Sequence, residues 1–122
     1  AFAKAHGLTP LARITGYATG GGEPKDLFFA PIFAVQNLMK KAGTTIGHYG
    51  LIEANEAFAA QCLADGKGLG WDPARVNVNV GASGARILTT LLYSMADHKV
   101  ATGLATLCLG GGNAVALSVE AV

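Results

Sequence analysis

Charged residues are scarce in this sequence, and the basic ones do not cluster. Asp, Glu, Lys and Arg make up 14% of the 122 residues, whereas a soluble domain has about 25%. The net charge is +1 and the longest basic run is Lys40-Lys41, so the sequence lacks the basic face that binding to nucleic acid requires. Because 51% of the residues are hydrophobic, we expect a domain that buries several surfaces, as a sheet covered on both faces does.

Long apolar runs and secretory features are also missing. No run reaches the ~18 residues of a membrane helix, and the first residues do not form a signal peptide, so we expect no membrane partner. The chain starts at Ala1 rather than at Met, which indicates a piece of a longer protein. Only two cysteines occur, Cys62 and Cys108. We expect them to be buried or catalytic rather than bridged, which favours a cytoplasmic location.

Hydrophobic periodicity predicts strands that alternate with helices. The expected strands are 11–17, 51–53, 76–79, 104–109 and 114–119, and the expected helices are 1–7, 32–42, 55–63 and 84–95. This order predicts a single α/β domain over residues 1–122, with a mixed, mostly parallel five-stranded sheet and helices on both faces. The glycines 110–112 are short enough for an antiparallel hairpin between the last two strands.

Cys108 lies near the end of an expected strand, one residue before three glycines. Position alone favours a small buried apolar residue, about two to one. The alternative is a functional thiol, because glycines leave backbone N–H groups uncovered and such groups beside a thiol could hold a developing oxyanion.

Asn55 lies where an expected strand meets an expected helix. A role as the helix N-cap is the simpler interpretation, and the alternative is a site residue, because α/β sites open at such junctions. Residues 81–86 could bind an anion at a helix N-terminus. We favour close packing of small residues there, since the glycine pattern matches no nucleotide-binding fingerprint.

The remaining candidate groups give weaker signals. All three histidines, His6, His48 and His98, are expected at the surface, because none lies beside a glycine-rich strand end. Cys62 falls on the apolar face of an expected helix and is predicted to pack in the core. No spacing of His and Cys indicates a zinc site, so no metal is expected.

Three motifs, in this order and spacing, resemble those of thiolases. Residues 55–58 (NEAF) match the family's motif of the same letters. Residues 76–79 (VNVN) and 81–86 (GASGAR) match the two ends of a longer signature of the family. Residues 108–112 match the family's C-terminal CxGGG motif. The resemblance extends over residues 1–122, so it implies the C-terminal domain of a thiolase, with the N-terminal half absent.

The resemblance implies a fold and a reaction. Thiolases stack two similar α/β halves and bury one helix of each between the sheets; here that helix would be 84–95. They transfer acyl groups between acyl-CoA molecules, by Claisen condensation or by thiolytic cleavage of a 3-ketoacyl-CoA. Coenzyme A is therefore an implied substrate, no separate cofactor is implied, and the expected partners are the N-terminal half and further copies in a homo-oligomer.

The resemblance also implies roles for three residues. Cys108 matches the acid/base cysteine, which takes a proton from the acetyl methyl group in condensation. Asn55 matches the residue that holds a water in the oxyanion hole of the resulting enolate. Gly110 matches a backbone N–H donor of the second oxyanion hole, which serves the acyl-enzyme step.

One family segment is missing between Asn79 and Val80. Thiolases carry there a glycine-rich stretch that ends in Gly-His-Pro, and its His activates the nucleophile. The nucleophilic cysteine itself belongs to the absent N-terminal half. We therefore predict that the chain alone is inactive. Two alternatives are a non-catalytic binding or assembly module of thiolase fold, and an active thiolase whose molecule retains the missing segment and its His.

Overall fold

The computed structural model describes residues 2–77 and 84–122. Within them the strands are β1 (Ala12–Gly21), β2 (Leu51–Ala54), β3 (Thr102–Leu109) and β4 (Asn113–Ala121). The α-helices are α1 (Phe2–Ala5), α2 (Ala30–Ala42), α3 (Ala59–Leu69) and α4 (Ala85–His98). Short 3-10 helices complete the fold: η1 (Pro24–Phe29), η2 (Ile46–His48), η3 (Pro73–Arg75) and η4 (Gly110–Gly112).

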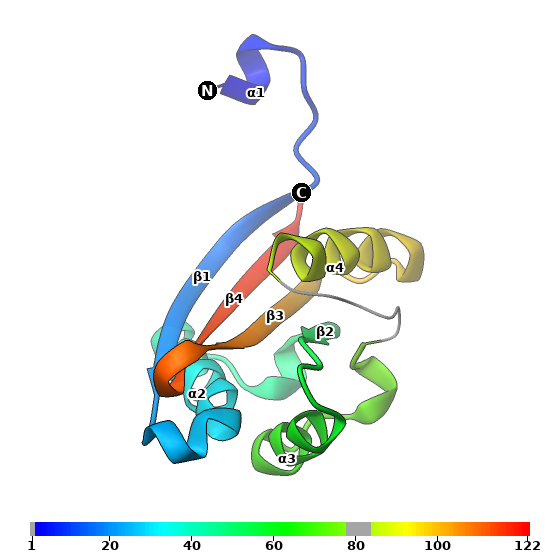
Figure 1. Cartoon of the computed structure of the whole chain (residues 1–122). Helices are drawn as coiled ribbons and strands as arrows, with labels where there is room; N and C mark the ends of the chain where they lie inside the picture. The colour runs from blue at the N-terminus through cyan, green and yellow to red at the C-terminus, as the bar shows by residue number, and fades with distance from the viewer. Residues whose placement is uncertain (1, 78–83) are drawn as a thin grey trace.

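The four strands form one mixed sheet in the order β1-β4-β3-β2 (Figure 1). The pair β2·β3 is parallel, whereas β1·β4 and β3·β4 are antiparallel. The α/β class and the mixed sheet are thus confirmed, but the expectation of mostly parallel pairing is wrong. Strands β1, β2 and β3 do run in one direction. The last strand returns through the glycine hairpin and inserts between β1 and β3, so both of its neighbours are antiparallel to it.

The fifth expected strand, 76–79, is not a strand in the described part of the chain. Val76 forms a single parallel bridge with Ile52 of β2, and Asn77 turns away with a φ of 49°. Residues 78 and 79 lie outside the described residues. The described sheet therefore has four strands, and the single bridge at Val76 lies beside β2.

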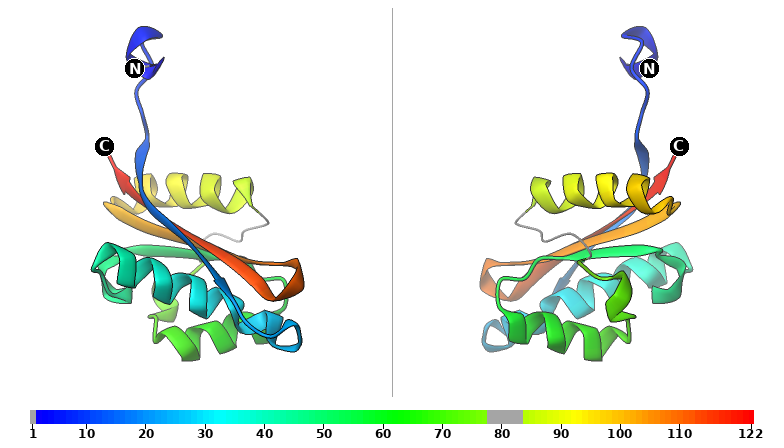
Figure 2. Two further views of the ribbon diagram at one scale, coloured as in Figure 1. Left: turned by 90° about the vertical axis from the view of Figure 1, so that its left-hand side faces the viewer. Right: turned by 90° about the vertical axis from the view of Figure 1, so that its right-hand side faces the viewer.

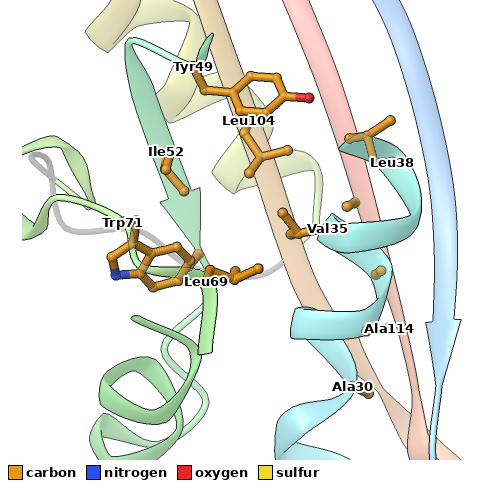
Figure 3. Packing of buried hydrophobic residues seen from close by; sticks show 12 residues of the cluster. Ala30, Val35, Leu38, Tyr49, Ile52, Leu69, Trp71, Leu104 and Ala114 are labelled. Carbon is orange, nitrogen blue, oxygen red and sulfur yellow. The ribbon is translucent and has the colours of Figure 1, made fainter. Parts of the chain in front are cut away.

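Helices cover both faces of the sheet, as the sequence predicts (Figure 2). On one face α2 and α3 pack over a core that includes Val35, Leu104 and Trp71 (Figure 3). On the other face α4 presents Ile87, Leu91 and Met95, spaced four residues apart, to a second apolar cluster. This spacing places the three side chains along one stripe of the helix.

Helix α2 lies unusually close to strand β1 at a glycine. A Cβ atom at Gly20 would lie 2.1 Å from the backbone nitrogen of Ala34. Both residues are buried, and the contact joins the second turn of α2 directly to the strand backbone. No side chain fits there, so glycine at position 20 sets the distance between this helix and the sheet.

None of the helices in residues 2–77 and 84–122 combines the length and apolar character needed to span a bilayer.

Candidate active site

The carboxyl ends of the parallel strands β2 and β3 bring two of the predicted site residues to one edge of the sheet. The backbone N–H of Asn55, which follows β2, donates to the carbonyl oxygen of Thr106 in β3 over 2.9 Å. Cys108 is two residues further along β3, so it lies on the same face as Thr106. That face is the one covered by α2 and α3, since Leu104 belongs to their core.

Cys108 is half-buried and has a defined partner. Its Sγ donates to Oε1 of Gln61 in α3 over 3.7 Å, and across the hairpin it pairs with Ala114. The thiol is free, as is that of Cys62. The prediction that both cysteines are unbridged is confirmed, and Cys108 is neither isolated in the core nor fully exposed.

The three glycines after Cys108 form the turn between β3 and β4. Gly110 is exposed, and a Cβ placed on it would meet no atom within 4 Å. Gly111 and Gly112 adopt φ values of 72° and 83°, which disfavour any residue with a side chain. Gly112 also lies close to Gly22, whose N–H donates to its carbonyl oxygen over 2.9 Å. The turn is therefore built for glycine, and it leaves space beside the Gly110 backbone.

Asn55 is not the N-cap of the following helix, which corrects the simpler interpretation of its position. Helix α3 begins at Ala59, and its N-cap residue is Phe58, without a side-chain capping bond. Residues 55–58 form an irregular connection in which the N–H of Ala57 donates to the Asn55 carbonyl over 3.1 Å. The half-buried Asn55 side chain makes no hydrogen bond to another described residue, so its amide is not engaged in capping.

Asn77 is a structural residue of this site to which the sequence analysis assigned no role. Its side-chain Oδ1 accepts from the Ala54 N–H over 2.7 Å, and its Nδ2 donates to the Ala54 carbonyl over 2.8 Å. Nδ2 also donates to Oε1 of Glu56 over 2.7 Å. The side chain thus replaces a neighbouring strand at the end of β2 and holds the backbone immediately before Asn55. In the sequence Asn77 is distinguished only as part of the matched VNVN segment, which gives no indication of this contact.

Three ionisable groups near this edge have raised pKa values. Burial raises the pKa of Glu53 to about 7, and the nearby charge of Glu56 adds to the effect. Burial likewise raises the pKa of Asp65 to about 7, which the Gln61 side chain partly offsets. Burial, followed by the charges of Glu56 and Asp65, raises the pKa of the Cys62 thiol. Cys62 packs against the core of α2 and α3 as predicted, and its raised pKa disfavours the reactive thiolate.

The other sequence candidates do not join this site within the described residues. The side chains of His6, His48 and His98 are exposed, as predicted. Residues 81–83 of the possible anion site, including the expected helix cap Ser83, lie outside the described residues. Helix α4 begins at Ala85 after Gly84, which has a φ of 60°.

The comparisons with known proteins agree with the arrangement of these motifs. A family model for the thiolase C-terminal domain matches residues 8–121. The acetyl-CoA acetyltransferase of Paracoccus denitrificans is 50% identical over 97% of this chain, and that of Escherichia coli is 51% identical over 97%. The chain spans about a third of these relatives, 32% of the length of each.

Solved structures give the same result. The Bacillus anthracis acetyl-CoA acetyltransferase superposes with a TM-score of 0.91 at 40% identity, over 99% of this chain and 33% of that one. Human mitochondrial 3-ketoacyl-CoA thiolase superposes with a TM-score of 0.93 at 34% identity, over the same shares. The chain is thus an α/β domain with the fold of a thiolase C-terminal domain. The chain belongs to the thiolase family and corresponds to the C-terminal domain of a thiolase.

Proposed function

We propose that this domain supplies the acid/base part of a thiolase active site, for acyl transfer between acyl-CoA molecules by Claisen condensation or thiolytic cleavage. The observation that carries the proposal is the meeting of Asn55, Cys108 and the Gly110 turn at the ends of β2 and β3. A thiol at this end of the strands, beside open backbone and a side-chain amide that makes no hydrogen bond to the described residues, fits proton transfer next to an oxyanion hole.

Each of the three residues has a distinct task in the proposed reaction. In condensation the Cys108 thiolate takes a proton from the acetyl methyl group, and the C–H electron pair becomes the enolate. Asn55 holds a water that donates to the enolate oxygen. The Gly110 N–H stabilises the oxyanion of the acyl-enzyme step. Coenzyme A esters are the substrates, and the chemistry needs no further cofactor from this domain.

The isolated chain is proposed to be inactive, because it lacks two further groups. The acylated cysteine of the family belongs to the N-terminal half, and without a nucleophile the covalent route is lost. The Gly-His-Pro segment is missing between Asn79 and Val80, and loss of a catalytic base costs about 10²–10⁴ in rate. Alignment with the P. denitrificans relative spans 127 positions, more than the 122 residues of this chain, so that relative has residues that this chain lacks.

A chimera tests the proposal directly. The C-terminal third of the P. denitrificans acetyl-CoA acetyltransferase would be replaced by this chain, with and without that relative's own Gly-His-Pro segment inserted between Asn79 and Val80. We expect CoA-dependent cleavage of acetoacetyl-CoA only with the insert. Cys108→Ala in the active chimera should then lower kcat by at least about 10²-fold. A folded chimera that stays inactive with the insert, or an active Cys108→Ala variant, would contradict the proposal.

The same chimera distinguishes a catalytic domain from the non-catalytic alternative. The absence of the activating His favours a binding or assembly module, which would bind CoA in the chimera without the insert and show no cleavage with it. The proposed partners are the N-terminal half and further copies of the protein in a homo-oligomer. Exposed apolar side chains on the edge strand β1, such as Ile14 and Tyr17, support such contacts.

A further inference from the structure

Helix α3 turns two polar side chains into the interior. Gln61 and Asp65 are each 3% exposed and lie four residues apart, one above the other on the same helix face. Nε2 of Gln61 and Oδ1 of Asp65 have no hydrogen-bond partner among the described residues. Unpaired buried groups of this kind destabilise a fold, so their presence in one place calls for a functional reason.

The two ends of the Gln61 amide face different neighbours. Oε1 accepts the hydrogen bond from Sγ of Cys108 over 3.7 Å. The other end carries Nε2, which makes no hydrogen bond of ordinary geometry to a described residue but lies near enough to the Asp65 carboxyl to lower the pKa of that group. The amide therefore stands between the thiol of β3 and a buried carboxyl of α3, and its oxygen and nitrogen can exchange places by a half-turn about the last side-chain bond.

We propose that Gln61 is a positioning residue for Cys108, which fixes the thiol and supplies an N–H donor to the thiolate. Its catalytic meaning depends on the acid/base role proposed above, whereas the contact itself does not. In the thiol form the amide oxygen accepts from S–H, as observed. In the thiolate form the half-turned amide donates its unpaired Nε2–H to Sγ.

The proton balance of the reaction is unchanged by this exchange. When Cys108 acts as base, the C–H bond of the acetyl group breaks, its electron pair remains on the enolate, and an S–H bond forms. Gln61 changes only which of its ends contacts the sulfur, and it neither gains nor loses a proton. It contacts the sulfur in both protonation states but stabilises the thiolate more, because a hydrogen bond to an ionised acceptor is stronger than one from a neutral S–H. An apolar side chain of the same length can do neither.

The test measures how the reactivity of Cys108 varies with pH in the 122-residue chain. Iodoacetamide alkylates the thiolate, and trypsin places the cysteines on different peptides, 42–67 for Cys62 and 100–122 for Cys108. The variants are Gln61→Met, which has a similar length and no polar end, and Gln61→Glu, which keeps the shape and removes the N–H donor. Gln36→Met, at an exposed position of α2, is the matched control.

We expect Gln61→Met to move the midpoint of the Cys108 pH–rate profile upward by about one pH unit, which is about tenfold less thiolate at a pH below the midpoint. Gln61→Glu should move it further, because a carboxylate then faces the sulfur. Gln36→Met should leave it in place. An unchanged midpoint in the folded Gln61 variants would overturn the proposal, and so would faster alkylation at every pH without a shift, which marks a merely loosened structure.

The outcome can be separated from that of the chimera experiment. Alkylation needs neither acyl-CoA nor the N-terminal half, so a shifted midpoint supports the role of Gln61 even where the chimera is inactive. An active chimera combined with unmoved midpoints would keep the proposed function and reject the positioning role.

Discussion

Asn77 shows how one side chain can complete the end of a strand. It satisfies both backbone groups of Ala54 and adopts a φ of 49°, a left-handed conformation that Asn tolerates better than most residues. Ala54 is buried, so water cannot easily replace the amide. We expect Asn77→Ala to lower the free energy of unfolding by about 2–4 kcal/mol, because it leaves two buried groups unpaired. Urea denaturation measures this change.

The matched control for that variant is Asn77→Gly. It removes the same hydrogen bonds but adopts a positive φ without strain, so it should be slightly more stable than Asn77→Ala. Both variants should also disturb the connection to Asn55, which follows Ala54 directly. If Asn77→Ala lowers the free energy of unfolding by less than about 0.5 kcal/mol, the range of ordinary surface changes, the hydrogen bonds from Asn77 to Ala54 do not stabilise β2.

At the residue scale the sequence predicts which residues meet at the candidate site, but it does not predict the hydrogen bonds that position them. Cys108 could be singled out because a thiol before three glycines is chemically distinctive, and Asn55 because it follows a buried strand. The capping role expected for Asn55 was wrong, since the chain continues irregularly to Phe58 before α3 begins. The roles of Asn77 and Gln61 were missed because each depends on a residue far away in the sequence. Local patterns carry no information about such contacts.

Among the elements, the contact between β1 and α2 depends on Gly20. A Cβ atom there would lie 2.1 Å from the Ala34 nitrogen, so Gly20→Ala must displace the helix or the strand. We expect it to lower the free energy of unfolding by about 3 kcal/mol, at the upper end of ordinary overpacking. Gly47→Ala is the control, because its nearest neighbour would be 3.9 Å away and its stability should hardly change. Thermal unfolding of the two variants checks the difference, and equal melting temperatures would contradict it.

The elements themselves were largely predictable, whereas their neighbours in the sheet were not. The helical spacing around Leu38 and the hairpin at 110–112 lie where the sequence places them. Alternation of strand and helix correctly predicts that β1, β2 and β3 run in one direction. The position of β4 between β1 and β3 pairs segments that are far apart in the sequence, and no local signal encodes such a pairing. Because of that single insertion, two of the three strand pairs in the described sheet are antiparallel, whereas a mixed but mostly parallel sheet was expected.

Considered as a whole, the molecule has two apolar layers and buried carboxyl groups within or beside them. Glu53 of β2 is 1% exposed, and it lies on the same face of β2 as Leu51, which packs in the α4 cluster. Asp65 of α3 is buried on the opposite side of the sheet. Both have a pKa raised to about 7, chiefly by burial. Because an unfolded chain returns such groups to ordinary values of about 4, stability must depend on pH.

The sign of this dependence follows from proton uptake. Between about pH 4 and pH 7 the folded chain keeps Glu53 and Asp65 protonated while the unfolded chain has released those protons. Their contribution to stability is therefore complete below pH 4, falls by about 1.4 kcal/mol per pH unit for each group, and levels off above pH 7. Urea unfolding at pH 5, 6, 7 and 8 should show this decline. Glu53→Gln or Asp65→Asn should each make the fall in unfolding free energy between pH 4 and pH 7 smaller by about 1.4 kcal/mol per pH unit. Stability that rises from pH 5 to pH 7 would mean that neither carboxyl is protonated in the fold.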